Sequence, residues 1–258
     1  MNKWVKIGIG VVAVIALGIA AVFYFTSGMV DTADSFFKAV KARDIAKARD
    51  YLAEDFKAGT DEKALADFLS KGAILDFKEA SWSNRNISGG RGELDGSITT
   101  QAGGTIPIKM MFIKEKGNWK IYSIRKPTAG LQSGDASPAA PAKADQVALV
   151  KQSMRDFIAS VDGKNMEHFR STVSTMWQKQ HTTEQLNEAF KALINAGANW
   201  SVLNNLEPVL AGESTVDKDG VLVVSGYYPT TPRKVHFEQK FIYEGIAWKL
   251  LGLNIEVK

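Results

Sequence analysis

The sequence contains no cysteine and few histidines, and both facts limit its chemistry. Without cysteine the chain can form no disulfide, no thiolate nucleophile and no cysteine-based zinc site. The three histidines, His168, His181 and His236, lie far apart and form no pair at the spacing of metal ligands. Because the carboxylates are not clustered either, we expect no metal site and no cofactor.

The chain also lacks a strong charge of either sign. Its net charge is +4, and Lys3 and Lys6 stand ahead of the first apolar run, so the rest of the chain is nearly balanced. The basic stripe of a nucleic-acid-binding protein is missing. The segment Ser88-Gly89-Gly90-Arg91-Gly92 lacks the helix and lysine of a phosphate-binding loop, and it predicts a hairpin turn.

One long apolar run is present, at the N-terminus. Ile7 to Phe25 are nineteen uncharged residues, and a helix of that length spans about 28 Å, close to the hydrocarbon core of a bilayer. Residues 1–29 are therefore predicted to be a cytoplasmic tip and a transmembrane helix, with the lipid bilayer as a partner. The lysines ahead of the run predict a cytoplasmic N-terminus at the inner (plasma) membrane, with most of the chain outside the cytoplasm.

A cleaved signal peptide is the alternative interpretation of this run. Gly18-Ile19-Ala20 offers small residues at a suitable spacing. However, Val22-Phe23-Tyr24-Phe25 continue the run beyond that point, with aromatic residues where an interfacial belt would lie. These residues favour a retained anchor.

The remaining chain has a length that suits two domains. Residues 128–144 are rich in Pro, Ala, Gly and Ser and lose apolar periodicity. This composition predicts a flexible linker between a first domain, 30–127, and a second domain, 145–258.

The two predicted domains repeat one pattern of apolar residues. An offset of 118 residues aligns Ala80, Trp82 and Ser83 with Ala198, Trp200 and Ser201. Offsets of 121 and 129 align, in order, Phe36, Val40, Leu52, Phe56, Ile108, Phe112 and Trp119 with Phe157, Val161, Val173, Trp177, Phe237, Phe241 and Trp248. Offsets that change only between elements indicate a duplicated domain with loop insertions.

Each copy is predicted to contain three helices followed by four strands. The first third of each copy has helical spacing, and Thr182 with Gln185 has the spacing of a capping box. Alternating apolar residues from Ile106 to Phe112 and from Val235 to Phe241 predict strands. The predicted fold class is α+β: an N-terminal transmembrane helix followed by two repeated domains, each with about three helices packed on a curved four-stranded antiparallel sheet.

Two motifs resemble the nuclear-transport-factor-2-like superfamily. They are the first helix, Ser35-Phe36-Phe37-Lys38-Ala39-Val40, and the closing strands, Gly117 to Ile121 and Ala247 to Leu250. The superfamily includes ketosteroid isomerase, scytalone dehydratase and the SnoaL cyclases, and the resemblance implies a cone-shaped domain in each copy. Because the fold serves enzymes, ligand binders and assembly subunits alike, the resemblance implies no activity.

An enzyme of this type needs an inward-facing acid or base, such as an aspartate beside a tyrosine. Strand alternation places His236 and Glu238 on the face opposite Val235 and Phe237. We therefore predict no catalytic residues and no enzyme. The scattered candidates, which do not correspond between the copies, are Tyr51, Asp76 and Asp95 in the first copy and Tyr227, His236 and Glu238 in the second.

Four aromatic residues are candidate contacts for a partner or ligand: Trp82, Trp200, Tyr227 and Tyr228. Aligned tryptophans in repeated domains either fill the core or stack on a ligand. Adjacent residues of a strand point to opposite faces, so one of the two tyrosines is expected to be exposed. Ordinary cross-strand packing is the alternative for that tyrosine.

Together these features predict a membrane-anchored, extracytoplasmic, non-catalytic interaction or scaffold protein, as a subunit or accessory factor of an envelope complex. Its partners would be other membrane or envelope proteins. The alternative is a binding module for a small apolar or amphipathic ligand in the cone cavity. An isomerase- or dehydratase-type enzyme is the less favoured third interpretation.

Overall fold

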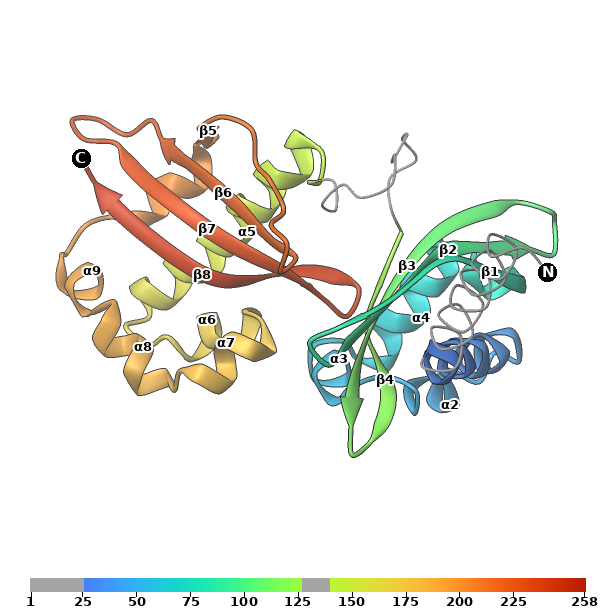
Figure 1. Ribbon diagram of the computed structural model, residues 1–258. Helices are drawn as coiled ribbons and strands as arrows, with labels where there is room; N and C mark the ends of the chain where they lie inside the picture. The colour runs from blue at the N-terminus through green and yellow to red at the C-terminus, as the bar shows by residue number, and fades with distance from the viewer. Residues whose placement is uncertain (1–25, 127–139) are drawn as a thin grey trace, which may run out of the picture. The chain divides into compact units, whose positions relative to one another are not determined.

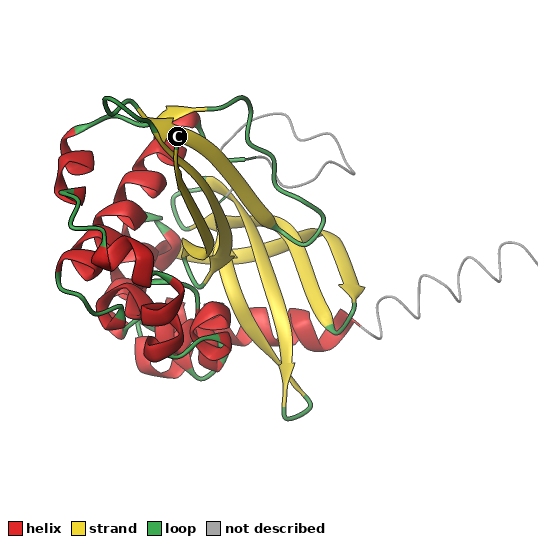
Figure 2. Ribbon diagram, turned by 90° about the vertical axis from the view of Figure 1, so that its left-hand side faces the viewer, coloured by secondary structure: helices red, strands yellow, loops and turns green. Residues whose placement is uncertain are grey.

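A computed structural model describes residues 26–126 and 140–258, which belong to two compact units that divide after Ala129 (Figure 1). Each unit contains its own helices and its own four-stranded antiparallel sheet, with strand orders β1-β2-β3-β4 and β5-β6-β7-β8. Within each unit the helices precede the strands along the chain, and the two kinds of element form separate layers (Figure 2).

The first unit opens with a helix described over residues 26–41. The elements that follow are α2 (Ile45–Arg49), α3 (Glu54–Gly59), α4 (Glu62–Lys71), the 3-10 helix η1 (Ile74–Asp76), β1 (Phe77–Ser88), β2 (Arg91–Thr100), β3 (Thr105–Glu115) and β4 (Asn118–Arg125). Thr26 and Met29 are buried, so the packed unit starts ahead of residue 30, where the sequence placed its boundary.

The second unit repeats this order with more numerous short helices. Its elements are α5 (Lys143–Asp162), α6 (Glu167–Thr172), α7 (Thr175–Gln180), α8 (Thr183–Ala189), α9 (Lys191–Asn195), η2 (Trp200–Asn205), β5 (Val209–Leu210), β6 (Val221–Tyr228), β7 (Val235–Glu244) and β8 (Ala247–Val257). Helix α5 begins inside the predicted linker, most of which lies outside the described residues.

Local sequence signals explain several of these boundaries. The predicted capping box at the start of α8 is present, with Thr182 and Gln185 bonding each other's backbone N–H groups. Asp61 caps α4, and its carboxylate accepts a hydrogen bond from the Ala64 backbone N–H. Lys116 and Gly117 both have positive φ, as the two-residue turn between β3 and β4 requires.

The predicted fold class requires correction. The α+β class and the four-stranded antiparallel sheets agree with the structure, but the membrane-spanning helix does not: no helix in residues 26–126 and 140–258 is long and apolar enough to cross a membrane. The longest one, α5, carries charged residues along its exposed face and buries only the other. The predicted span itself, Ile7–Phe25, lies outside the described residues.

The helical layers also differ from the three helices predicted per copy. Four α-helices are described in the first unit and five in the second, because the chain after the first helix of each unit is divided into short helices, most of them five to seven residues long. In both units one break has a residue with positive φ, Arg43 and Lys164, which align at the offset of 121. The breaks are therefore part of the repeated pattern.

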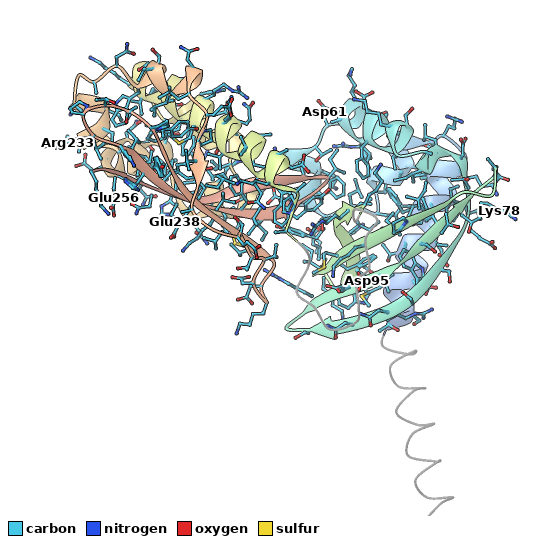
Figure 3. All side chains as sticks on the ribbon, turned by 90° about the horizontal axis from the view of Figure 1, so that it is seen from above. Asp61, Lys78, Asp95, Arg233, Glu238 and Glu256 are labelled. Carbon is cyan, nitrogen blue, oxygen red and sulfur yellow. The ribbon has the colours of Figure 1, made fainter. Side chains whose placement is uncertain are left out.

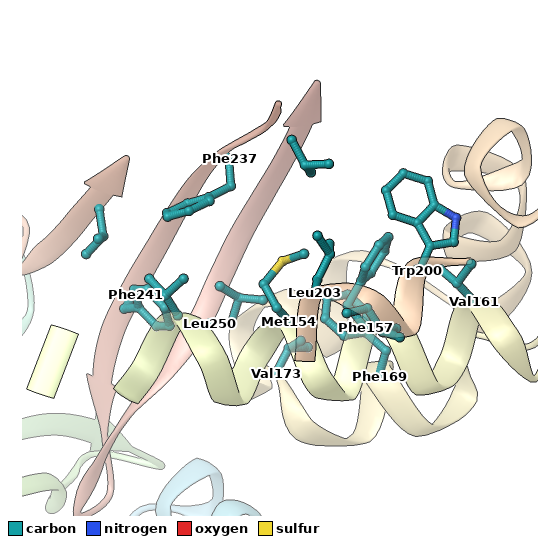
Figure 4. Close-up of a cluster of buried hydrophobic side chains, with 14 of the residues drawn as sticks. Met154, Phe157, Val161, Phe169, Val173, Trp200, Leu203, Phe237, Phe241 and Leu250 are labelled. Atoms are coloured by element: carbon teal, nitrogen blue, oxygen red, sulfur yellow. The ribbon is translucent and has the colours of Figure 1, made fainter. Parts of the chain in front are cut away.

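The core of the second unit fills the space between α5 and the sheet (Figure 4). Phe157 is fully buried and meets the rings of Phe169 and Phe190 edge to face, with centroids 5.3 and 4.9 Å apart. Phe237 and Phe241 on β7 close the cluster from the sheet side. Their alternation with exposed Glu238 confirms the predicted orientation of this strand.

A glycine in the second strand of each sheet lets the first strand approach closely. A Cβ atom at Gly96 would lie 2.0 Å from the Ser81 carbonyl oxygen, and one at Gly226 would lie 2.3 Å from the Val209 carbonyl oxygen. The last strand of each sheet carries a β-bulge at an aligned position, at Tyr122 of β4, opposite Met111 and Phe112, and at Leu251 of β8, opposite Lys240 and Phe241. These features bend both sheets in the same place.

Candidate functional site

An arginine in each unit holds the end of a short helix through backbone carbonyls. Arg49 donates to the carbonyl oxygens of Thr60, at 2.7 Å, and Lys57, at 3.4 Å. Arg170 donates to the carbonyl oxygens of His181, at 2.7 Å, and Gln178, at 2.6 Å. All three positions of one set align with those of the other at the offset of 121, so the same contact is built twice.

A glutamate at the end of the third strand caps the same short helix from the other side. The Glu54 backbone N–H donates to the Glu115 carboxylate at 3.0 Å. The Thr175 backbone N–H donates to the Glu244 carboxylate at 3.1 Å, and the Thr175 hydroxyl adds a bond of 2.6 Å. Glu115 and Glu244 align at the offset of 129.

The last strand of each sheet is tied to the helical layer at the same point. The Ala53 N–H donates to the Ile121 carbonyl at 2.8 Å, and the Ser174 N–H donates to the Leu250 carbonyl at 2.9 Å. Together with the arginine and glutamate contacts, these bonds form a frame of hydrogen bonds around α3 in the first unit and an equivalent frame around α7 in the second. The sequence comparison missed these polar pairs because it followed apolar positions, although the same offsets align them.

Removal of the arginine should destabilise each unit separately. We expect Arg170→Met and Arg49→Met each to lower the free energy of unfolding of its own unit by about 2–4 kcal/mol, because each leaves backbone carbonyls without a charged donor. Urea unfolding, monitored in each unit by hydrogen exchange, measures this loss of stability. Arg233→Met, at an exposed position (Figure 3), is the matched control, and an equal loss there would contradict the interpretation.

The four aromatic candidates are not brought together. Trp82 lies in β1, beside Phe37 at a centroid distance of 6.4 Å. Trp200 lies in η2, is 6% exposed, and donates to the Leu193 carbonyl at 3.3 Å. The alignment of these two tryptophans at the offset of 118 is therefore wrong, since one is in a strand and the other in a 3-10 helix.

The two tyrosines of β6 point to opposite faces of the sheet, as the sequence predicted. Tyr228 is 1% exposed and packs against Phe237, and burial raises the pKa of its hydroxyl above the ordinary range. The depression beside it, lined by Lys151, Arg155, Leu203 and Asn204, has no space for a water molecule. Tyr228 is therefore a core residue.

Tyr227 belongs to the solvent-facing side of the second sheet. Its ring lies 5.6 Å from the ring of His236, and the Lys234 ammonium lies over it at 4.2 Å from the centroid. Glu238 and Glu256 lie on the same face of the neighbouring strands (Figure 3). Of the four candidates, Tyr227 has the best position to contact a protein partner.

Comparisons with known proteins do not assign this arrangement to a family. No family model and no curated protein matches the chain. Among solved structures, the chain is similar to a cystatin-like protein from Ruminococcus gnavus ATCC 29149, at 11% sequence identity and a TM-score of 0.31. The similarity covers 94% of this chain and 95% of that one. It is too weak to carry an argument, so functional interpretation depends on the residues themselves.

The candidate acids and bases are also dispersed. Asp76 is exposed and lies 3.8 Å from Arg43. Tyr51 accepts a backbone hydrogen bond from Ile121 through its carbonyl group. His236 and Glu238 face solvent on β7, as predicted. None of these side chains is placed beside another in a shared pocket among the described residues.

One half-buried charged group does form, on the first sheet. Lys109 contacts the Glu93 carboxylate at 2.6 Å and the Asp95 carboxylate at 3.4 Å. Burial and the neighbouring Asp95 raise the pKa of Glu93, although Lys109 acts in the opposite direction. The paired lysine makes this group a cross-strand ion network. No group of three His, Cys, Asp or Glu residues that could hold a metal ion occurs in the described part of the chain.

Proposed function

We propose that the protein is a non-catalytic interaction or scaffold protein, a subunit or accessory factor that presents two related α+β domains to protein partners of the cell envelope. As part of this proposal, both domains are of the nuclear-transport-factor-2-like type. The order of helices followed by a bent four-stranded sheet in each unit supports this assignment.

The repeated frame is the observation that carries the proposal. Arg49 and Arg170, like Glu115 and Glu244, make the same contacts in both units. These residues hold the helices and strands of their own unit together. The candidate acids and bases, by contrast, do not correspond between the units, and the two that meet, Tyr227 and His236, lie on the solvent-facing side of the second sheet. A chain that duplicates its scaffold without a matched polar site is better suited to contact than to chemistry.

The interior of the second unit supports the same proposal. Side chains from α5, η2 and the sheet form one continuous buried cluster. A domain of this kind uses its outer surface for recognition. The solvent-facing side of β6, with Tyr227, is the surface that we propose for a partner contact.

The location in the cell stays a prediction from the sequence. According to this prediction, the protein lies at the inner membrane with most of the chain outside the cytoplasm, where envelope proteins would be its partners.

Crosslinking in intact cells, followed by purification in detergent, tests the proposal. We expect defined partners to be recovered from the membrane fraction with the wild-type chain and to decrease at least about fivefold with Tyr227→Ala, as a central interface tyrosine commonly contributes this much or more. Val223→Ala, on the same strand and face, is the matched control. A protein that always purifies alone, or that is recovered from the cytosol, would count against the proposal.

Ligand binding is a second candidate because one buried donor in the first unit has no partner. The indole N–H of Trp82 is buried without a hydrogen-bond acceptor among the described residues. On the helix of residues 26–41, which carries Phe37 beside Trp82, partial burial and the neighbouring Asp31 raise the pKa of Asp34. Native mass spectrometry of the purified chain separates the two functions, since a retained small amphipathic molecule would favour this one.

A further inference from the structure

The second sheet has an open edge along β8. This strand is the last in the order β5-β6-β7-β8 and pairs with β7 on one side only (Figure 1). The corresponding strand of the first unit, β4, ends at Arg125, which aligns with Asn254. Because β8 continues to Val257, its uncovered edge is longer than that of β4.

The backbone groups of three β8 residues point away from β7. Lys234 and Lys258 exchange two hydrogen bonds, of 2.7 and 3.0 Å, and these fix the bonded pairs of the ladder. Bonded and non-bonded pairs alternate in an antiparallel ladder, so the N–H and C=O groups at the open edge are those of Leu253, Ile255 and Val257. They have no hydrogen-bond partner within residues 26–126 and 140–258.

The side chains of the same residues are apolar and incompletely covered. Leu253 and Ile255 are partly buried against the core, and Val257 is 44% exposed. The edge has neither a proline nor a bulge beyond Gly252, and these are devices by which proteins protect such edges. An edge without them can accept a further strand.

We propose that this edge binds β8 of a second copy of the chain, antiparallel, about a two-fold axis at Ile255. In this register Leu253 lies opposite Val257 of the other copy, and the three unpaired N–H and C=O groups of each strand meet their counterparts. The apolar side chains then cover one another on the inner face of the joined sheet. The interaction is independent of the function proposed above.

The charges of the strand select this register. On the solvent-facing side Asn254 lies opposite Glu256 of the other copy, and Gly252 lies opposite Lys258, so no like charges meet. A shift of two residues in one direction would place the two Glu256 side chains opposite each other, which is destabilising. A shift in the other direction would place Val257 opposite Leu251, the unpaired residue of the bulge. The strand is thus self-complementary in one register.

Substitution of Val257 by proline tests the pairing. Its N–H does not bond to β7, so proline removes an edge donor and leaves the existing ladder intact. In sedimentation of the full chain in non-ionic detergent, we expect the wild-type dimer to have a dissociation constant below about 100 μM. Val257→Pro should raise this constant at least about tenfold, because two symmetric hydrogen bonds are lost. Val257→Thr, which keeps the N–H, should dimerise as wild type does. A monomeric wild type, or a proline variant that dimerises equally, would overturn the proposal.

Cysteine pairing tests the register, because the chain has no cysteine of its own. Asn254 and Glu256 face each other in a non-bonded pair, whose Cα separation of about 4.5 Å suits a disulfide. A mixture of Asn254→Cys and Glu256→Cys chains should form a crosslinked dimer under mild oxidation, in at least about fivefold higher yield than either variant alone, since neither residue faces itself. Equal yields from the single variants, or none from the mixture, would overturn the register. The crosslinking experiment described above separates this inference from the proposed function. If Val257→Pro abolishes the dimer but other proteins are still captured, the two interactions are distinct.

Discussion

Replacing Phe157 with alanine should lower the free energy of unfolding of the second unit by about 3–5 kcal/mol. The side chain is fully buried in the cluster of the second unit (Figure 4), and the rings of Phe169 and Phe190 pack against it edge to face. Its removal leaves a cavity that α5 and the sheet cannot close without breaking their other contacts. Since a domain is stable by about 5–15 kcal/mol, the loss is a large part of the total.

Phe36→Ala provides the same test in the first unit. Phe36 aligns with Phe157, is also fully buried, and meets Phe37 edge to face at 5.2 Å. We expect each variant to lower the urea midpoint of unfolding of its own unit only. Tryptophan fluorescence and hydrogen exchange of the full chain in urea monitor this midpoint. Gln152→Ala on the exposed side of α5 is the control and should change stability by less than about 0.5 kcal/mol. A single shared shift for both phenylalanine variants would contradict two separate cores.

The agreement between Phe36 and Phe157 shows what the sequence could predict. Apolar residues repeat with the period of the element that contains them, so buried helix and strand positions can be recognised in both copies. The four strands of each sheet agree with the same signals. Alternation also placed His236 on the solvent-facing side of β7.

Short matches outside a periodic pattern were less reliable. Trp82 and Trp200 share two neighbouring residue types, yet one lies in a twelve-residue strand and the other in a 3-10 helix. The strand that corresponds to β1, β5, has only two residues. The turn-forming residues between β5 and β6, among them Gly212 and Gly220 with positive φ, explain why the chain leaves the sheet there.

The frame residues could have been found in the sequence but depend on packing for their meaning. Arg49 and Arg170 are identical and align, as do Glu115 and Glu244. Such alignment alone does not distinguish a binding residue from a structural one. The distinction comes from the partners, which belong to the same unit and are backbone groups, apart from the Thr175 hydroxyl that also donates to Glu244. For this reason the polar repeat supports a scaffold and not a duplicated active site.

Replacing Gly96 or Gly226 with alanine should also have a large effect, about 2–4 kcal/mol in the unit concerned, because the added methyl group would overlap backbone atoms of the preceding strand. The overlap at Gly96 involves the Ser81 carbonyl oxygen and the Cα atom of Trp82, which side-chain rotation cannot relieve. At Gly226 the ring of Phe237 lies within 2.8 Å of the new Cβ atom as well. The first strand of either sheet would have to move away from the second.

Gly252→Ala is the matched control for this comparison. It is also a strand glycine, but a Cβ atom there would meet only the Lys240 side chain, at 3.7 Å. Without a clash, alanine loses less conformational entropy on folding, so we expect this variant to equal or exceed wild type by up to about 1 kcal/mol. Thermal and urea unfolding of the three variants measures the difference. If all three variants had the same stability, the close backbone contacts at Gly96 and Gly226 would not explain why glycine is present there. The shared bend of the sheets would then need another cause.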